Sequence, residues 1–173
     1  GVPKIWVFEF GVAGGTGLVA LQTYAERIER NTGVRIRVYG FDTGEGLPEH
    51  CGDYRDHPDQ WRPQDYKMDV PRLKARLTER TTLVLGNVAD TILAFVAEGH
   101  PPTGFVACDV DFYSSTKDVL QLFTLPGKRM LMRVHMYFDD VDSFFNHRFA
   151  GELLAIDEFN ASNSLVKIDR WWS

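Results

Sequence analysis

This sequence has few cysteines, no surplus of basic residues and no long apolar run. Each of these features excludes a class of protein. Only two cysteines occur among the 173 residues, too few for a disulfide framework or a cysteine-rich zinc site, so a reducing, cytoplasmic setting fits best. The formal net charge of -5 leaves no basic surplus for nucleic acid or an anionic membrane surface. No apolar run approaches the roughly 20 residues that span a membrane. We therefore expect a globular domain without nucleic-acid or membrane partners.

Strand-like and helix-like segments alternate along most of the chain. Apolar runs rich in β-branched and aromatic residues predict strands at 4–10, 34–41, 81–86, 103–110 and 129–138. Apolar residues at three- and four-residue spacing predict helices at 17–31, 69–79, 89–99 and 115–124. Several of the strands are apolar on both faces, which is typical of a parallel sheet covered by helices on both sides.

The last third of the chain changes this rhythm. A short helix is predicted at 142–151, and two strands at 152–160 and 165–171 are joined by a turn, which predicts an antiparallel edge to the sheet. Residues 42–68, rich in Gly, Pro, Asp and His, form one long irregular stretch of the kind that is usually functional or mobile. No repeat or second domain is visible, so we expect residues 1–173 to form a single domain.

A glycine-rich turn follows the first predicted strand. The stretch "VFEFGVAGGTGLVAL" places Glu9 and several glycines where a strand turns into a helix, and glycines there let the backbone approach a ligand and expose helix N-terminal amides. The spacing differs from the G-x-G-x-x-G pattern of dinucleotide-binding folds. An acid two residues before the first glycine suits a ligand without a phosphate but with a charged amino-acid end. Tight packing of strand against helix is the alternative explanation.

Asp42 ends the second predicted strand. Doubly wound folds place at this point a carboxylate that accepts hydrogen bonds from ribose hydroxyls. Together with the glycine turn, Asp42 therefore predicts an adenosine ligand. Taken alone, Asp42 would be interpreted as a turn cap, because "DTGEG" has the composition of a turn.

Three carboxylates follow the last two of the five consecutive strands. Asp109 ends the fourth strand, and Asp139 with Asp140 ends the fifth, so they are expected to meet at one edge of a parallel sheet. Crowded like charges raise one another's pKa unless a cation neutralises them, and Mg²⁺ or a similar hard divalent ion takes such oxygen ligands. The alternative is that Asp109 caps a loop and the paired acids begin the next helix.

Further polar and aromatic residues lie near these motifs. We expect Asp111 to order the turn into the helix beginning near Ser115, by accepting amide hydrogen bonds. Tyr54, Trp61 and Tyr66 in the long irregular stretch either cover a ligand or pin the loop to the core, and the sequence is compatible with both.

Taken together, these motifs resemble the class I S-adenosylmethionine-dependent methyltransferases, and specifically the family of macrocin and related sugar O-methyltransferases. "EFGVAGG" is similar to the first glycine motif of that family, "YGFDTGEGLP" to its second motif and "LVLGNVADTI" to the segment after its third strand. "DVDFYSSTKDVL" is similar to its D-x-D-x-Y-x-S-T run, and "YFDDV" to its paired acids. The resemblance covers nearly the whole chain, and the second motif and the "DVDFYSST" run are its specific parts.

The resemblance implies a fold and a reaction. The fold is a Rossmann-like, doubly wound α/β sandwich of three layers, with a mostly parallel, seven-stranded sheet and an antiparallel C-terminal edge strand. Family members carry an N-terminal helical segment that closes over the acceptor, whereas this sequence starts at the first strand, so we expect that lid to be lacking. The implied reaction is Mg²⁺-assisted O-methylation of a small polyhydroxylated acceptor, and a homo-oligomer is compatible with it.

The resemblance also implies roles for individual residues. Asp109 is the implied general base and, with Asp139 and Asp140, an implied Mg²⁺ ligand. Glu9 and the glycines would flank the methionine end of S-adenosylmethionine, and Asp42 its ribose. The residues implied to bind the cofactor are Glu9, Gly11, Val12, Gly15, Gly17, Asp42, Thr43, Asn87, Val88 and Asp109.

Two other functions are open at this point. A methyltransferase-like domain that binds cofactor or partner without catalysis would carry the same motifs. An NAD-dependent oxidoreductase would share the fold, but the glycine spacing argues against it.

Overall fold

The computed structural model describes residues 2–50 and 52–170. Cys51, which the sequence places in a polar loop, and the last residue of the strand expected at 165–171 therefore lie outside the described residues.

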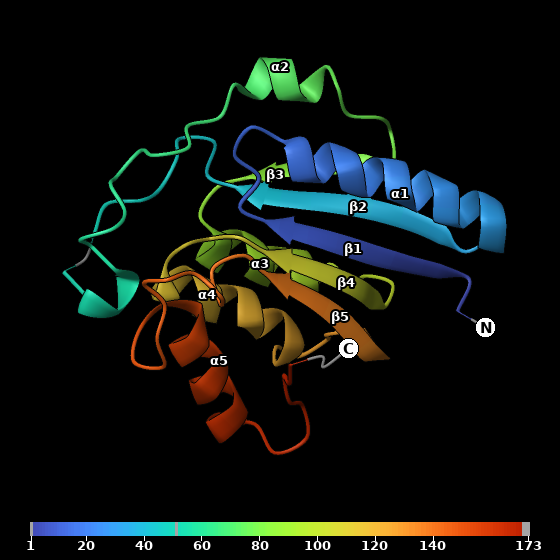
Figure 1. Cartoon of the computed structure of the whole chain (residues 1–173). Helices are drawn as coiled ribbons and strands as arrows, with labels where there is room; N and C mark the ends of the chain where they lie inside the picture. Colours follow the sequence, from blue (N-terminus) through green and yellow to red (C-terminus); the bar gives the residue numbers. More distant parts are fainter. Residues whose placement is uncertain (1, 51, 171–173) are drawn as a thin grey trace.

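Five parallel strands form a single sheet in the order β3-β2-β1-β4-β5. The strands are β1 (Lys4–Phe10), β2 (Arg35–Asp42), β3 (Thr81–Leu85), β4 (Thr103–Cys108) and β5 (Met130–Phe138). The chain builds the sheet outward from β1, first to one side through β2 and β3 and then to the other through β4 and β5. The order therefore reverses between β1 and β4, which is where open α/β sheets bind ligands. All five arrows point to the same side in Figure 1.

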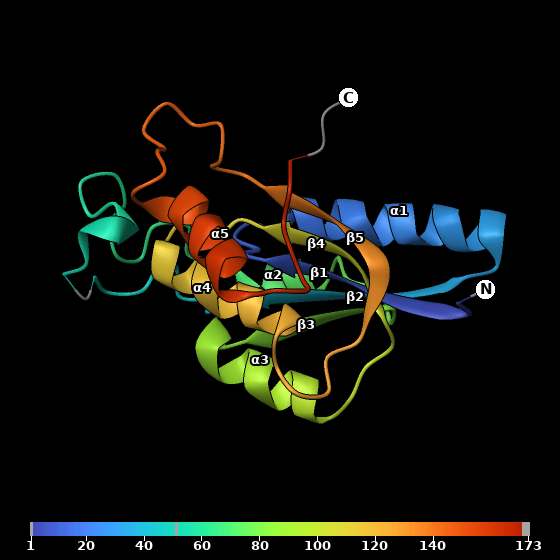
Figure 2. The same cartoon turned by 90° about the horizontal axis from the view of Figure 1, so that it is seen from below.

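Helices cover both faces of the sheet. Helices α1 and α2 lie on one face and α3, α4 and α5 on the other, which gives three layers (Figures 1 and 2). The helical segments are α1 (Thr16–Thr32), η1 (Tyr54–Asp56), α2 (Val70–Lys74), α3 (Val88–Ala97), α4 (Tyr113–Leu120), η2 (Gln121–Phe123) and α5 (Gly151–Ser162), of which η1 and η2 are single turns of 3-10 helix.

Alternation along β1 divides the core into two parts. Phe8 and Phe10 belong to the cluster beneath α3, α4 and α5, and Phe10 stacks on Phe41 of β2 with ring centroids 4.8 Å apart. Val7 belongs to the cluster on the α1 side. Because successive side chains of a strand point to opposite faces, Glu9 also lies on the α1 side, beneath the beginning of that helix.

The prediction of a seven-stranded sheet with an antiparallel edge is wrong for the part of the chain that the structure describes, in which the sheet has five strands, all parallel. Residues 152–160, predicted as a strand, lie in helix α5. The buried residues of α5 are Gly151, Glu152, Ala155 and Phe159, a spacing that follows a helical period. Short apolar runs do not distinguish a strand from a buried helix, and here the tertiary structure decided for the helix.

The second strand predicted near the C-terminus is also absent from the described residues up to 170. Val166 and Ile168 pack against the main core cluster. The side-chain amide of Asn160 donates to the carbonyl of Ile168 at 2.7 Å and accepts from its amide at 2.8 Å. A helix side chain thus satisfies the backbone groups of Ile168 that a neighbouring strand would otherwise bind.

Smaller corrections concern the helices. The helix expected at 142–151 is a series of turns, and the helix expected at 69–79 contains only Val70–Lys74. In the described part of the chain, no helix has both the length and the apolar character that a membrane crossing requires.

Substitution of Gly11 tests how closely the ends of β1 and β4 approach. A Cβ at Gly11 would lie 1.6 Å from the carbonyl oxygen of Asp109, and its φ of +81° is left-handed. We expect Gly11→Ala to lower the free energy of unfolding by roughly 3 kcal/mol or more in urea titrations. Gly14→Ala is the matched control, because a Cβ there has no neighbour within 4 Å. Equal stability of the two variants would contradict this packing.

Candidate functional site

Parallel pairing aligns the ends of four strands in one row. The register pairs Phe10 of β1 with Phe41 of β2 and with Cys108 of β4, and Cys108 with Phe138 of β5. The next residue of each strand is therefore Gly11, Asp42, Asp109 and Asp139. A pocket of about 230 Å³ opens along this row. Its lining residues include Gly11, Ala13, Asp42, Thr43, Gly46, Leu47, Pro48, Trp61, Tyr66, Gly86, Asn87, Val88, Asp109, Asp111, Ser115, Asp139 and Asp140.

Asp42 joins the ends of β1 and β2. Its Oδ2 accepts hydrogen bonds from the amides of Val12 (2.8 Å) and Ala13 (3.0 Å), and its Oδ1 accepts from the amide of Gly44 (2.7 Å). The turn-cap interpretation of Asp42 is thus confirmed. The carboxylate still lines the pocket, and because each oxygen has further acceptor capacity, these bonds leave room for a ligand hydroxyl.

Two glycines of the turn after β1 are closely surrounded by other protein atoms. A Cβ at Gly15 would lie 2.2 Å from Cδ1 of Leu73, and a Cβ at Gly17 would lie 1.9 Å from Oε1 of Glu9. Val12 is buried in the core. Of the residues predicted to bind cofactor, Glu9, Val12, Gly15 and Gly17 do not line the pocket, whereas Gly11 does. Close packing against Leu73 of the helix at Val70–Lys74 explains Gly15, and close packing of strand against helix explains Gly17.

Glu9 is a buried carboxyl close to the pocket. Its side chain is only 8 % exposed, and its Oε2 is buried without a hydrogen-bond partner among the described residues. Burial, together with the charges of Asp109 and Asp42, raises the pKa of Glu9 to about 8. A cation reaching this position would therefore stabilise the charged carboxylate.

The end of the pocket near β2 and β3, away from β5, is lined by Thr43, Asn87 and Val88. The Asn87 side chain caps α3 by accepting from the amide of Ala89 at 2.9 Å. The Thr43 hydroxyl donates to the carbonyl of Gly46 at 2.7 Å. These predicted cofactor residues are thus brought together in the structure, beside Asp42.

The acids predicted at the ends of β4 and β5 also lie together. Asp109, Asp139 and Asp140 all line the pocket. Burial raises the pKa of Asp109 to about 6, with further contributions from the charges of Asp139 and Asp140. The backbone holds Asp109 and Asp139 beside each other, because the amide of Asp109 donates to Phe10 and that of Asp139 donates to Cys108.

Residues after β5 hold Asp140 in place. Its backbone amide donates to Oε2 of Glu152 (3.0 Å), its carbonyl accepts from Asn146, and its Oδ1 accepts from the Ser143 hydroxyl (3.1 Å). Glu152 is fully buried, and burial raises its pKa to about 9. Asp139 in turn accepts a hydrogen bond from the Tyr137 hydroxyl. The alternative that the paired acids begin a helix is wrong, since turns follow them.

The three acids do not form a preformed metal cage. Among residues 2–50 and 52–170, no group of three or more His, Cys, Asp or Glu side chains is arranged to hold a metal ion. Tyr137 and Ser143 each occupy one oxygen of the paired acids. The three acids thus lie close together, as the sequence predicts, but their carboxylate oxygens do not point toward a common metal position.

The prediction for Asp111 is wrong. Helix α4 begins at Tyr113, and Asp111 makes no hydrogen bond within the described part of the chain. Instead it lines the pocket at a left-handed φ of 60°, and burial raises its pKa to about 8, with Asp109 and Asp140 adding to the shift. The amide and hydroxyl of Ser114 donate to Asp56 at 2.8 and 3.0 Å. The first turn of α4 is therefore capped from the long loop.

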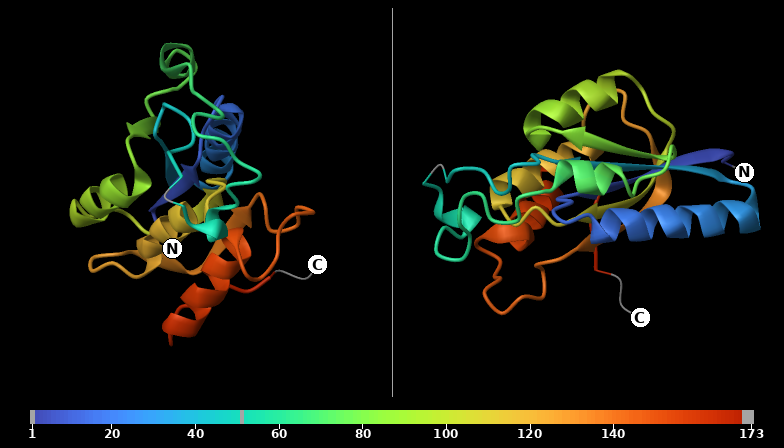
Figure 3. Two further views of the ribbon diagram at one scale, coloured as in Figure 1. Left: turned by 90° about the vertical axis from the view of Figure 1, so that its left-hand side faces the viewer. Right: turned by 90° about the horizontal axis from the view of Figure 1, so that it is seen from above.

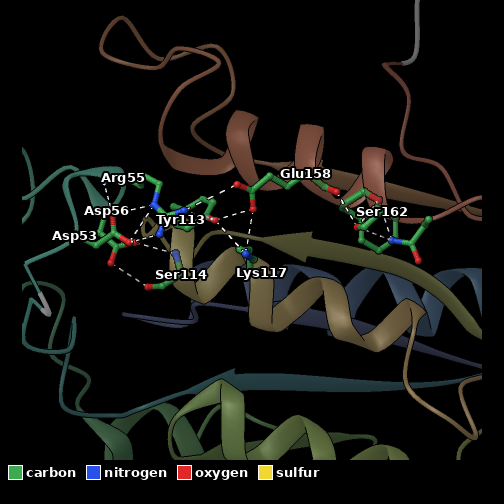
Figure 4. Close-up of polar contacts among 10 residues, drawn as sticks. Asp53, Arg55, Asp56, Tyr113, Ser114, Lys117, Glu158 and Ser162 are labelled. Carbon is green, nitrogen blue, oxygen red and sulfur yellow. Dashed lines mark hydrogen bonds and ion pairs between the residues drawn. The ribbon is translucent and has the colours of Figure 1, made fainter.

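Polar contacts tie the described residues of the long loop, 43–69 between β2 and α2, to helices α4 and α5 (Figure 4). Arg55 pairs with Asp53 and donates to the Tyr113 hydroxyl at 2.9 Å. That hydroxyl donates to Glu158 of α5 at 2.7 Å. The left view of Figure 3 faces this edge, where the loop lies beside the segment after β5. Neither Asp56 nor Glu152 was identified from the sequence, because both act on residues far along the chain.

The fold and the site together define a class. The chain has a Rossmann-like α/β fold with a ligand pocket at the carboxyl ends of its parallel strands, where the strand order reverses.

Solved structures of one enzyme share this architecture. The chain is similar to the crystal structure of CalS11, a calicheamicin methyltransferase, with a TM-score of 0.68 and 25% identity, over 88% of this chain and 63% of that one. The apo structure of CalS11, described as a TDP-rhamnose 3'-O-methyltransferase of calicheamicin biosynthesis, matches with a TM-score of 0.56 and 25% identity, over 91% of this chain and 63% of that one. No family model and no curated protein sequence matches. The chain thus spans less than two thirds of the length of CalS11.

The buried carboxyl of Glu9 predicts a pH-dependent stability. Because its pKa in the folded chain, about 8, exceeds the ordinary value of 4.5, its contribution is fully present below pH 4.5 and is lost as the pH rises toward 8. We expect Glu9→Gln to lose less stability than wild type between pH 5 and pH 8.5, by on the order of a few kcal/mol in denaturant titrations. Glu98→Gln, at an exposed glutamate, is the control and should follow wild type. Parallel curves for wild type and Glu9→Gln would rule out a buried, proton-holding Glu9.

Proposed function

We propose that this chain is an S-adenosylmethionine-dependent O-methyltransferase that acts on a hydroxyl of a small polyhydroxylated acceptor, a sugar or a secondary metabolite. The observation that carries the proposal is the row of strand ends in one pocket, with Asp42 and Asn87 toward one end and Asp109 with Asp139 toward the other. The similarity to CalS11 supports it. As finer parts of the proposal, the chain belongs with the macrocin-type enzymes and works in the cytoplasm.

The residues present fit an adenosine cofactor with an amino-acid end. We assign Asp42 and Thr43 to the ribose hydroxyls and Asn87 and Val88 to the base, since all four line the pocket. The orphaned Oε2 of Glu9, beneath the first turn of α1, suits an ammonium group. Glu9 lies behind the pocket wall in the structure, so its effect on such a group is electrostatic.

Asp109 is the proposed general base. S-adenosylmethionine, when bound, supplies a methyl group on a positively charged sulfur, which is already electrophilic. The chain has then to orient the acceptor hydroxyl in line and to take its proton. Asp109 lines the pocket at the strand-order switch, so its carboxylate is the group we assign to receive that proton. Without a bound cation, the charges of Asp139 and Asp140 raise the pKa of Asp109, which favours a proton there after transfer.

We also propose that the acidic edge binds Mg²⁺, with Asp109, Asp139 and Asp140 as ligands. The donor set fits a hard cation in its chemistry, since it offers carboxylate oxygens whose mutual repulsion a cation would relieve. When bound, the cation would lower the pKa of an acceptor hydroxyl. Binding requires Asp139 and Asp140 to redirect oxygens that now accept from Tyr137 and Ser143.

Calorimetric titration distinguishes the proposed cofactor from its alternative. We expect binding of S-adenosylmethionine and S-adenosylhomocysteine and no binding of NAD, because the glycine turn lacks the pyrophosphate-binding spacing. Tight binding of NAD without a response to S-adenosylhomocysteine would contradict the proposal. Methyl transfer from labelled S-adenosylmethionine to TDP-rhamnose then separates an enzyme from a domain that only binds cofactor. Asp109→Asn should reduce methyl transfer far more than it weakens binding of S-adenosylhomocysteine.

Removal of the paired acids tests the Mg²⁺ proposal. We expect Asp139→Asn/Asp140→Asn to weaken Mg²⁺ binding by on the order of a hundredfold or more, because two ligand charges are lost. Asp111→Asn is the matched control, since it neutralises a carboxyl in the same pocket that is not assigned as a ligand. Calorimetry with S-adenosylhomocysteine present measures both. Unchanged affinity in the double variant would make the paired acids structural, and loss of Mg²⁺ in Asp111→Asn alone would exchange the roles of Asp109 and Asp111.

A further inference from the structure

The three aromatic residues that the sequence placed in the long loop have separate positions in the structure. Trp61 and Tyr66 line the pocket. Tyr54 does not line it, and its side chain is 70% exposed. Only Trp61 and Tyr66 are therefore available to touch a ligand in the pocket.

Trp61 and Tyr66 lie at the acidic end of the pocket. Trp61 contacts Tyr66 and Phe145, with ring centroids 6.4 and 5.5 Å away, and Phe145 belongs to the segment that follows Asp139 and Asp140. The pKa of Tyr66 is raised by burial and by the charges of neighbouring acids. Asp111 has the largest effect among these acids, and Asp109 and Asp140 have smaller ones. The two rings thus share the acceptor end of the proposed site with the assigned general base.

Hydrogen bonds hold the backbone that carries these two rings. The amide of Trp61 donates to the carbonyl of His57 at 3.2 Å, and its carbonyl lies 2.8 Å from Nε2 of His50. Gln64 donates to Leu47 at 2.8 Å across the loop. Tyr66 has a left-handed φ of 63°, a strained conformation that persists only where its surroundings enforce it and that is concentrated at ligand sites. The backbone that carries the two rings is therefore in place before any ligand arrives.

The indole of Trp61 has an unused donor. Its Nε1 is buried and has no hydrogen-bond partner in the described part of the chain. Buried indole N–H groups usually have a partner. If the indole turns its N–H toward the pocket, an oxygen atom of a ligand would supply one.

We propose that Trp61 and Tyr66 form the acceptor-binding surface and that they bind a pyranose ring by its apolar C–H face. This inference rests on the proposed O-methyltransferase function. A sugar ring has C–H groups on its face and hydroxyls at its edge, so it can contact the aromatic rings while one hydroxyl reaches Asp109. The Nε1 of Trp61 donates to a second oxygen of the same sugar. The combination of a few polar groups with aromatic walls is the general pattern of small-molecule pockets.

TDP-rhamnose, the sugar nucleotide in the description of the apo CalS11 structure, is the probe for a saturation-transfer NMR experiment. Irradiation of the aromatic protein resonances should transfer saturation to the C–H protons of the rhamnose ring. We expect Trp61→Leu and Tyr66→Leu each to raise the dissociation constant of TDP-rhamnose roughly tenfold and to reduce the transfer. Trp61→Phe keeps a ring but loses the N–H donor and should give a smaller loss. Tyr54→Leu, in the same loop, is the matched control and should behave as wild type.

Calorimetry with S-adenosylhomocysteine on the same samples separates this inference from the proposed function. Trp61→Leu and Tyr66→Leu should leave that affinity within about twofold of wild type, which also reports that the variants are folded. Lower S-adenosylhomocysteine affinity with unchanged TDP-rhamnose affinity would overturn the inference, because the rings would then serve the cofactor. Absence of saturation transfer to rhamnose in wild type would overturn it as well. The wild-type chain could also show saturation transfer to rhamnose that depends on Trp61 and yet not bind S-adenosylhomocysteine. That result would support the sugar-binding surface and refute the proposed methyltransferase function.

Discussion

The carboxylate of Asp42 is the contact on which the pocket depends. It accepts three backbone amides, two from the turn after β1 and one from the start of the long loop. Charge-assisted hydrogen bonds of this kind are stronger than neutral ones. One side chain thereby sets the position of the glycine turn against β2 and the direction in which the long loop leaves the sheet. These two segments form two of the walls of the pocket.

Several buried acids lie close together beside the pocket, although their charges repel one another. Asp109, Asp111, Asp140 and Glu152 all have pKa values raised by burial, so each would be more stable in water as a carboxylate. The backbone register of β1, β4 and β5 nevertheless brings them together, and the hydrogen bonds to Asp140 keep them there. Concentration of perturbed acids in one pocket is typical of functional sites, and a bound cation or a transferred proton would relieve the repulsion.

The long loop connects the two halves of the site. Asp56 caps α4 from this loop, Arg55 reaches Tyr113, and the rings of Trp61 and Phe145 meet across the strand ends. Segments 43–69 and 139–150 are thus held to each other as well as to the sheet. A site built from a rigid sheet edge and an anchored loop keeps its geometry without a ligand, which reduces the ordering that binding would otherwise require.

The sequence alone was sufficient for the parts of this protein that depend on local pattern. It located β1 at 4–10 and the other four strands to within two residues, and it placed Asp42, Asp109, Asp139 and Asp140 at strand ends because apolar runs stop there. The tertiary structure decided the rest. Residues 152–160 became a helix because burial of Glu152 and Phe159 needed a helical period. Asp56, and not Asp111 as the sequence predicted, caps the first turn of α4. Both outcomes depend on contacts between segments far apart in the chain, and no local pattern encodes such contacts.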